Sequence, residues 1–206
     1  MGSLLTPTAV APGAWRYAVA CFAVAVPTVL VAPPVGVAAL ALGVAALWFH
    51  RDPDRTPPDS GIVAPADGRV SVIREEGDRI RVGIFMNVTD VHVNRAPTTG
   101  TVESVDHRPG ANKPAFSKDS DRNERVVIDC EEYEFALIAG WFARRIHPYV
   151  AAGDELVRGQ RIGHVSFGSR ADVLLPATND RSDVLVTKGD TVRAGETQLV
   201  ATDSPR

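Results

Sequence analysis

The first 50 residues are almost entirely apolar, whereas the rest of the chain alternates short apolar runs with polar turns. Residues 17–31 and 35–49 form two apolar runs of 15 residues each, separated by Pro33-Pro34. As a helix, each run would be about 22 Å long, shorter than the ~30 Å hydrocarbon core of a bilayer. Proline at position 33 would break one continuous helix. The pattern therefore predicts a helical hairpin over residues 1–50, with its tip at the two prolines.

The residues that flank the two runs are typical of a membrane surface. Trp15 and Tyr17 mark one base of the hairpin and Trp48 marks the other. Arg16 and Arg51 would then lie on the same side, which the positive-inside rule makes cytoplasmic. A cleaved signal peptide is the alternative. It is disfavoured because no positive cluster precedes the apolar runs and their combined length is twice that of a signal segment.

After residue 50 the pattern changes to that of a β-domain. A linker rich in Pro and Asp covers 51–58, and no long helical periodicity follows it. Runs rich in Val and Ile, bounded by Gly, Pro, Asp and Asn, predict strands at 68–73, 79–85, 100–105, 125–130, 134–141 and 161–167. Residues 107–124 are polar and predict a long loop. We expect a mainly β fold, with a compact sandwich or barrel-like domain over residues 51–206.

A weak internal repeat lies in the second half of this domain. Residues 153–160 resemble 189–196 at an offset of 36, with Gly-Asp, then Leu or Val, then a further Gly. Turns of this kind occur in small lipoyl-like barrels, so a membrane-anchored adaptor or binding module without catalysis is an alternative function. Such a module carries a modifiable lysine at a hairpin tip between the halves, whereas Lys188 lies beside the second turn.

Charge and cysteine content exclude several function classes. All but one of the 22 Lys and Arg and all 25 Asp and Glu follow residue 50, so the β-domain is mildly acidic and has no basic run. This argues against nucleic acid as a partner. Cys21 and Cys130 lie in different segments, and no zinc-type Cys/His spacing exists. A reducing compartment fits best.

The Gly168-Ser169 step lies within an apolar stretch, 161–176, that predicts a strand. A serine hydroxyl can attack the preceding carbonyl, and glycine places no side chain in the way. The resulting ester can eliminate to dehydroalanine, which hydrolyses to a pyruvoyl group on a new amino terminus. Most Gly-Ser pairs are turns or linkers, so the dipeptide needs support from the rest of the chain.

A second cluster runs from Asp90 to Pro97. On an extended strand, Asp90, His92 and Asn94 would share one face, where a carboxylate could orient the imidazole. No third ligand lies at a spacing that would indicate a metal site. Asp67-Gly68 is typical of a turn. His107, His147 and His164 have no recognisable partner in the sequence and are typical of structural histidines.

Five motifs together make the chain similar to a known family. They are Phe49-His50-Arg51-Asp52-Pro53, Ala64-Pro65-Ala66-Asp67-Gly68, Asp90-Val91-His92-Val93-Asn94-Arg95-Ala96-Pro97, Arg122-Asn123-Glu124-Arg125 and Phe167-Gly168-Ser169-Arg170. In this order they resemble the short, archaeal-type branch of the phosphatidylserine decarboxylase family, over nearly the whole chain.

The resemblance implies a proenzyme that cleaves itself between Gly168 and Ser169 into a β chain (1–168) and an α chain (169–206). Ser169 would become the covalent pyruvoyl cofactor. Asp67 matches a motif whose Asp belongs to the maturation machinery, and His92 matches a histidine linked to decarboxylation. Arg95 replaces the second histidine of the longer enzymes' motif, which leaves Asp67 and, as the orienter of His92, Asp90 as candidates for activating Ser169. Arg170, where the larger forms have threonine, has no role that the sequence assigns.

The implied reaction is decarboxylation of the serine headgroup of phosphatidylserine or archaetidylserine, through a Schiff base to the pyruvoyl group, with His92 as the acid that protonates the product carbon. The implied partners are a serine phospholipid, the membrane and the chain's own α and β pieces, and a homo-oligomer is compatible with the sequence. The β-domain would lie on the cytoplasmic face of the cell membrane. A pyruvoyl enzyme for a soluble amino acid is a second alternative, which the apolar hairpin disfavours.

Overall fold

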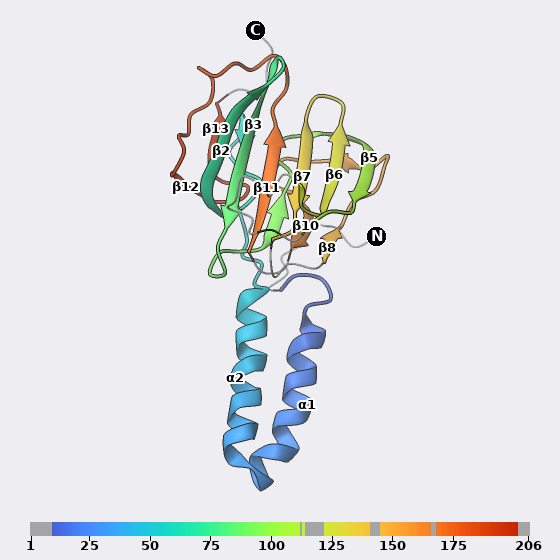
Figure 1. Cartoon of the computed structure of the whole chain (residues 1–206), viewed down its shortest axis with the longest axis vertical. Helices are drawn as coiled ribbons and strands as arrows, with labels where there is room; N and C mark the ends of the chain where they lie inside the picture. Colours follow the sequence, from blue (N-terminus) through green and yellow to red (C-terminus); the bar gives the residue numbers. More distant parts are fainter. Residues whose placement is uncertain (1–9, 112, 114–121, 141–144, 166–167, 202–206) are drawn as a thin grey trace. The chain divides into compact units, whose positions relative to one another are not determined.

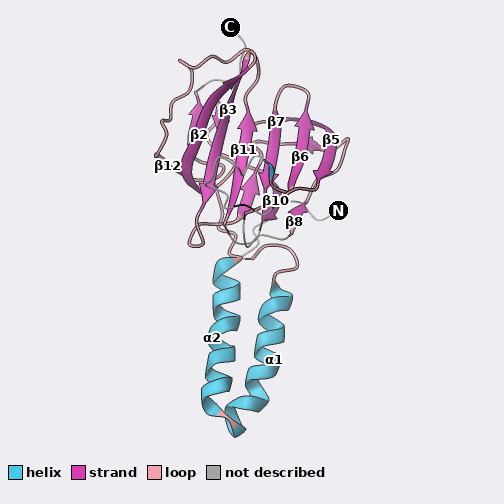
Figure 2. Ribbon diagram, viewed as in Figure 1, coloured by secondary structure: helices cyan, strands magenta, loops and turns pink. Residues whose placement is uncertain are grey.

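The computed structural model describes residues 10–111, 113, 122–140, 145–165 and 168–201. These residues divide into two compact units, 10–54 and 55–201. The first unit is helical and the second is built from strands (Figure 2). The mainly β fold with an N-terminal helical pair agrees with the sequence prediction.

The first unit is a hairpin of two helices, α1 (Trp15–Val31) and α2 (Pro33–Phe49) (Figure 1). Ala32 alone separates them, and Pro33 occupies the first turn of α2, where its missing N–H costs no hydrogen bond. The predicted tip at Pro33-Pro34 therefore lies at the start of the second helix. Gly36 faces the backbone of Val29 so closely that a Cβ could not fit, which lets the helices meet at their tip. Among the described residues, no helix is both long and apolar enough to cross a membrane.

The second unit is dominated by one curled antiparallel sheet, in which eight of the described strands have the order β12-β2-β3-β11-β7-β6-β5-β9 (Figures 1 and 2). In that order they are β12 (Thr191–Val192), β2 (Gly68–Glu76), β3 (Arg79–Met86), β11 (Ser169–Leu174), β7 (Glu134–Ile138), β6 (Arg125–Cys130), β5 (Gly100–Arg108) and β9 (Glu155–Leu156). Two small sheets complete the unit: β4 (Val93–Arg95), β10 (Arg161–Val165) and β8 (Ile146–Pro148) in the order β4-β10-β8, and β1 (Ile62–Val63) with β13 (Gln198–Val200).

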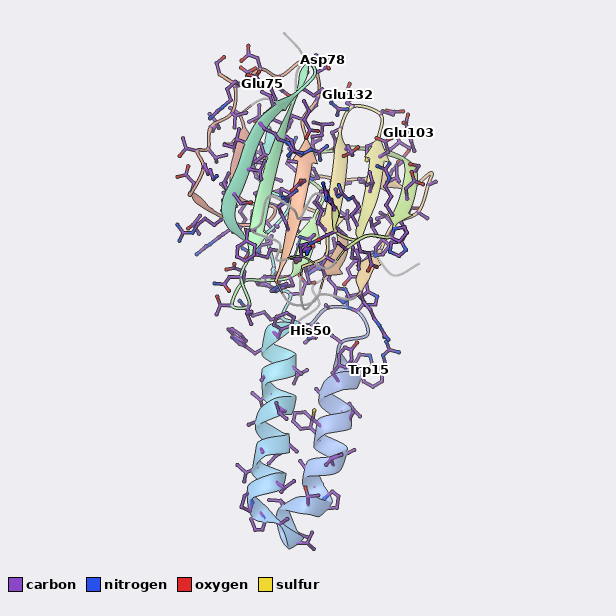
Figure 3. All side chains as sticks on the ribbon, viewed as in Figure 1. Trp15, His50, Glu75, Asp78, Glu103 and Glu132 are labelled. Carbon is purple, nitrogen blue, oxygen red and sulfur yellow. The ribbon has the colours of Figure 1, made fainter. Side chains whose placement is uncertain are left out.

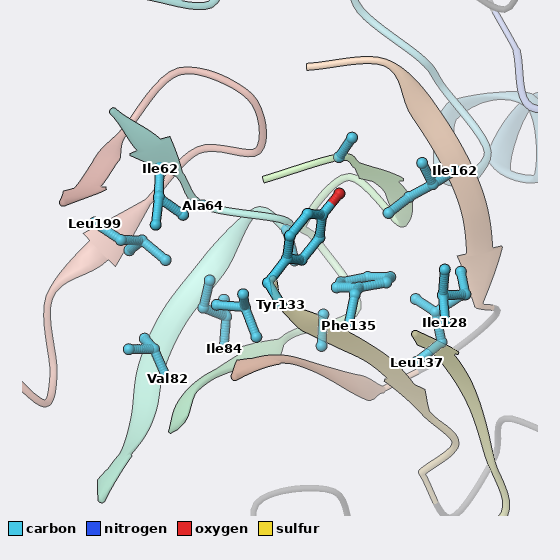
Figure 4. Packing of buried hydrophobic residues seen from close by; sticks show 14 of the residues in the cluster. Ile62, Ala64, Val82, Ile84, Ile128, Tyr133, Phe135, Leu137, Ile162 and Leu199 are labelled. Atoms are coloured by element: carbon cyan, nitrogen blue, oxygen red, sulfur yellow. The ribbon is translucent and has the colours of Figure 1, made fainter. Parts of the chain in front are cut away.

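Alternate residues of the central strands fill one face of the large sheet, here called the inner face. Val82 and Ile84 of β3 are fully buried there, together with Phe135 (Figure 4). Ala171 and Val173 of β11 belong to the same buried cluster. Burying each valine, isoleucine or phenylalanine contributes about 1.5–3 kcal/mol, so this face supplies most of the stabilisation. Ser169 is two residues before Ala171 and therefore shares the inner face.

The repeated turns build the two edges of the large sheet in the same way. Asp154 and Asp190 each accept a hydrogen bond from the backbone N–H three residues earlier, at 2.9 and 2.8 Å. Each aspartate also receives the N–H of an equivalent valine on its carbonyl, Val102 on β5 and Val70 on β2. The short strands that follow, β9 and β12, are the two edge strands. The repeat found in the sequence is thus an internal pseudo-symmetry of the fold.

The predicted strands at 68–73, 79–85, 100–105 and 125–130 are confirmed, with small extensions. The predicted strand at 134–141 ends at Ile138, and residue 141 lies outside the described residues. The apolar stretch 161–176 is not one strand: β10 ends at Val165, and β11 begins at Ser169 in a different sheet. Of the loop predicted at 107–124, His107 and Arg108 belong to β5, and 112 and 114–121 lie outside the described residues.

Candidate active site

Ser169 is the first residue of β11 and is completely buried. Gly168 precedes it with a φ of +63°, in the left-handed region that glycine adopts without strain. A side chain at 168 would cost about 1–2 kcal/mol in backbone strain, although a Cβ there would meet no described atom. The sequence placed this step inside a strand; the structure places it at the sharp entry to one. The backbone conformation therefore favours glycine at this position.

The Ser169 hydroxyl faces the sulfur of Met86, directly opposite on β3, at 3.9 Å. A thioether is a weak acceptor, so this contact does not hold the hydroxyl in place. Asn94 of β4 reaches the same sulfur through Nδ2 at 3.5 Å. Ser169 and Asn94 thus contact the same sulfur atom, which places the segment that contains Asp90, His92 and Asn94 near Ser169. Among the described residues, the buried Asn94 Oδ1 has no hydrogen-bond partner, which marks a polar spot next to the serine.

His92 is buried two residues before Asn94, and its ring is oriented by Asp90 through the backbone. His92 Nδ1 lies 3.0 Å from the Asp90 carbonyl oxygen, which can only accept, so Nδ1 carries the proton and Nε2 is the basic nitrogen. The Asp90 carboxylate instead accepts the N–H of Asn87 at 2.7 Å. The expected carboxylate–imidazole contact is therefore replaced by a carbonyl–imidazole contact. The cause is that β4 begins only at Val93 and Asp90 ends a turn over residues 87–90, so Asp90 is not on the predicted strand.

The Asp67 carboxylate is bound by Arg55 and by the backbone of Ala194. Arg55 Nη2 donates to both carboxylate oxygens at 2.9 and 2.7 Å, and the N–H of Ala194 donates to Oδ1 at 2.8 Å. No described contact joins Asp67 to Ser169. The following Gly68 is required because a Cβ would collide with the Phe85 carbonyl oxygen. The structure therefore shows Asp67 as the anchor of a turn at the start of β2, and its maturation role stays a prediction.

Comparison with known proteins gives the site its context. Residues 42–200 match the family model described as phosphatidylserine decarboxylase. A Halobacterium salinarum protein named as an archaetidylserine decarboxylase proenzyme is 58% identical over 91% of this chain and 96% of its own length. A Streptomyces griseus phosphatidylserine decarboxylase proenzyme is 48% identical over 74% of this chain and 72% of its own. A Thermobifida fusca protein of the same name is 49% identical over 74% and 71%. The chain belongs to the phosphatidylserine decarboxylase family.

In this decarboxylase Arg170 has a clear structural place that the sequence did not reveal. Residues 170 and 172 alternate with the inward-facing Ser169, so their side chains lie on the outer face of the sheet. Arg170 donates to both oxygens of Asp172, from Nε at 2.7 Å and from Nη2 at 2.9 Å, and both residues are buried. The Asp172 carboxylate also lies against Gly83, where a Cβ would come within 2.7 Å of Oδ1. The pair lies within β11, directly beside Ser169.

Arg95 is the residue that the family resemblance sets against the second histidine of the longer enzymes. Its Nη1 donates to the carbonyl of Gly159 at 3.2 Å, and its backbone N–H donates to Pro65. A guanidinium stays protonated, so Arg95 cannot act as the base that the histidine would supply. Its contacts tie β4 to two neighbouring turns.

The Arg122–Arg125 motif makes hydrogen bonds to backbone groups of neighbouring segments. Asn123 is buried, and its Nδ2 donates to the carbonyls of Lys113 and Ala139 at 2.6 and 2.8 Å. Ala139 in turn donates its N–H to the Glu124 carbonyl at 2.9 Å. Arg170 pairs with Ile138, and continuing that register by one residue places Ala139 beside Ser169. The motif therefore supports the end of β7 next to the serine.

Proposed function

We propose that this decarboxylase is made as a proenzyme, cleaves itself between Gly168 and Ser169, and removes CO₂ from the serine headgroup of phosphatidylserine or archaetidylserine. The proposal rests above all on Ser169: a buried serine, at the entry to a central strand, preceded by a glycine in the left-handed conformation. The proenzyme names of the relatives support it.

In the proposed cleavage, the Ser169 Oγ attacks the Gly168 carbonyl carbon and takes over the acyl group from the amide nitrogen, giving an ester. Loss of the Cα proton breaks the Cβ–O bond, so Gly168 leaves as a carboxylate and residue 169 becomes dehydroalanine. Water then replaces the amino nitrogen, ammonia is released, and a pyruvoyl group remains. Glycine favours the first step because no side chain shields its carbonyl.

The residues around Ser169 fit a small electrophilic group. β11 lies between β3 and β7 and is paired with both, so the end of the new α chain would stay in the sheet after cleavage. Met86 gives an apolar wall, and the Asn94 amide gives a polar contact on the same side. When present, the pyruvoyl group would supply a ketone that condenses with the substrate amine and accepts the electrons released with CO₂.

His92 is suited to handle the proton that replaces CO₂. Its Nδ1–H bond to the Asp90 carbonyl orients the ring and leaves Nε2 for proton transfer. Burial excludes water that would otherwise protonate the intermediate without control. In decarboxylation, Asp90 acts through its backbone carbonyl, which orients His92. In self-cleavage, the carboxylates of Asp67 and Asp90 remain the candidates for activating Ser169.

The two helices support an interfacial role. Large apolar side chains are exposed along both of them, with Leu30 and Val31 84% and 83% exposed near the tip. An exposed apolar surface of this kind favours insertion into the headgroup region of a bilayer, where the substrate's headgroup lies. We propose that the hairpin is membrane-associated, with the β-domain on the cytoplasmic face. Replacing Leu30 and Leu42 by glutamate should reduce co-flotation of the full chain with anionic vesicles, and unchanged flotation would contradict this role.

The central experiment is an intact-mass measurement under denaturing conditions. The purified wild-type protein should give two chains divided before residue 169, with no free amine on the second. Ser169→Ala should remain one chain and be inactive. His92→Ala should be cleaved but lose turnover by roughly 10²-fold or more. A wild-type protein that stays whole and still decarboxylates phosphatidylserine would refute the proposed mechanism.

A further inference from the structure

The described part of the β-domain contains a pocket of about 490 Å³ between the large sheet and β8. Its apolar lining residues are Val105, Val126, Ile146 and Pro148. Of its described lining, Glu124 alone belongs to one of the five sequence motifs, because the walls come from three separate strands, β5, β6 and β8.

The first link between the pocket and the proposed chemistry runs along the large sheet. Glu124 lines the pocket, and its backbone carbonyl accepts the N–H of Ala139, which lies beside Ser169. Glu124 is two residues from the inward-facing Val126, so its side chain is on the same face as Ser169. Two strand spacings separate the two backbones, about 10 Å.

The second link runs along the small sheet. The backbone N–H of Val165 donates to the His92 carbonyl, and Val165 pairs with Ile146 of β8. Ile146 lines the pocket, so the pocket is also two strands from His92. Both proposed catalytic residues are therefore connected to the same pocket by short and independent paths.

The rim of the pocket is polar and cationic. The exposed His107 contacts the Glu124 carboxylate at 2.8 Å, which engages the one acidic side chain among the described lining residues. Arg145 then supplies a positive charge. His147 stacks on His164 with ring centroids 4.5 Å apart, and His164 is fixed by the Tyr149 hydroxyl at 2.6 Å.

Several exposed acidic side chains lie away from the pocket. Glu75, Asp78, Glu103 and Glu132 lie at the far end of the large sheet, where β11 ends (Figure 3). Ser169 begins β11 and so lies at the opposite end. Arg145 lies on the segment entering β8, at the Ser169 end, so an anion in the pocket would meet a positive side chain there.

We infer that this pocket binds the phosphodiester and glycerol part of the lipid substrate, with the phosphate against Arg145 and His147 and the first apolar atoms against the valine, isoleucine and proline side chains of the lining. The inference rests on the proposed function and adds to it the part of the chain that recognises the substrate outside the reacting serine. A phosphodiester is the expected ligand because a guanidinium beside imidazole donors matches its charge and oxygen geometry.

Arg145→Gln tests the inference, with Arg193→Gln as the matched control, since Arg193 is an exposed arginine at the other edge of the sheet. Steady-state kinetics would use glycerophosphoserine and dihexanoyl phosphatidylserine, after intact mass has confirmed equal cleavage. Arg145→Gln should raise KM for both substrates about tenfold with kcat nearly unchanged, as expected for loss of one charge-assisted contact. Val105→Asn should raise KM mainly for the substrate that carries acyl chains. KM values for Arg145→Gln equal to those of Arg193→Gln would overturn the inference.

A binding measurement separates this inference from the proposed reaction. Calorimetric titration of dihexanoyl phosphatidylserine into the uncleaved Ser169→Ala protein needs no turnover. Adding Arg145→Gln should weaken this binding about tenfold, and adding Arg193→Gln should not. Equal affinity in the two double variants would overturn the pocket assignment even if the enzyme is active. Loss of binding in the Arg145 variant would support it even if wild-type catalysis proved to be different.

Discussion

The ion pair beside Ser169 allows a quantitative test of how the reactive strand is held. The perturbation is removal of the Asp172 carboxylate by Asp172→Leu. Asp172 and Arg170 are only 1% and 3% exposed, and Arg170 donates to both carboxylate oxygens. Arg81 Nη1 lies 3.9 Å from the same carboxylate. The pKa of Arg81 is raised first by its hydrogen bond to Glu76 and then by the charge of Asp172, against the lowering effect of burial. Arg170 is therefore the main partner of Asp172, and Arg81 is a weaker one.

Breaking a buried pair by removing one partner costs about 3–5 kcal/mol, because the remaining charge loses its compensation. Asp172→Leu should fall within this range through its effect on Arg170, since Arg81 keeps Glu76 and Glu134 as closer partners at 2.8 and 3.1 Å. Arg170→Met should cost less, because Arg81 still compensates Asp172. The double variant Arg170→Met/Asp172→Leu should lie within about 2 kcal/mol of the parent, since replacing a whole buried pair by apolar groups is often nearly neutral. The single variants should therefore be strongly non-additive.

The assay is urea unfolding of the full chain in mild detergent, carried out in a Ser169→Ala background so that every variant is one uncleaved chain. The midpoint should fall and the slope should stay constant, which shows that stability alone has changed. Arg74→Gln is the control, because Arg74 pairs with Glu76 at a more exposed position and should cost less than about 1 kcal/mol. If Asp172→Leu were as mild as Arg74→Gln, or if the double variant were the least stable of the set, the reasoning about the buried pair would be wrong.

Three further outcomes follow from single sites. Gly168→Ala should slow self-cleavage while the chain still folds, because the left-handed φ is strained for alanine by about 1–2 kcal/mol; normal cleavage by intact mass would show that this conformation is not needed. Burial raises the pKa of the Cys130 thiol, so in a Cys21→Ser background iodoacetamide at pH 8 should label the chain only after unfolding, and rapid native labelling would contradict the buried position. Asn94→Leu should leave the fold intact but lower either the cleavage rate or kcat, because it removes the amide beside Met86 and Ser169; unchanged values of both would remove Asn94 from the site.

Local patterns in the sequence were enough to predict most helices and strands and to single out the Gly168-Ser169 bond. The two apolar runs and Pro33 predicted the hairpin because a helix break at proline is a local property. Strands such as 79–86 and 125–130 were readable from their Val and Ile content and bounding turns. The two Gly-Asp turns were visible as a repeat, since each aspartate bonds only three residues back along the chain. Gly168-Ser169 stood out because its chemistry depends on two adjacent residues.

The tertiary structure decided which groups meet, because those contacts join residues that the sequence separates widely. Asp67 is held by Ala194, 127 positions away, so the motif alone could not show that its carboxylate anchors a turn. Strand alternation could not place Asp90 correctly, because the chain turns before β4 and presents a carbonyl to His92 in place of the carboxylate. The outward side of Arg170 and the pocket two strands from Ser169 follow from sheet register, which long-range pairing sets. Local propensity determined what each segment becomes, and the packing of distant strands determined what surrounds the serine.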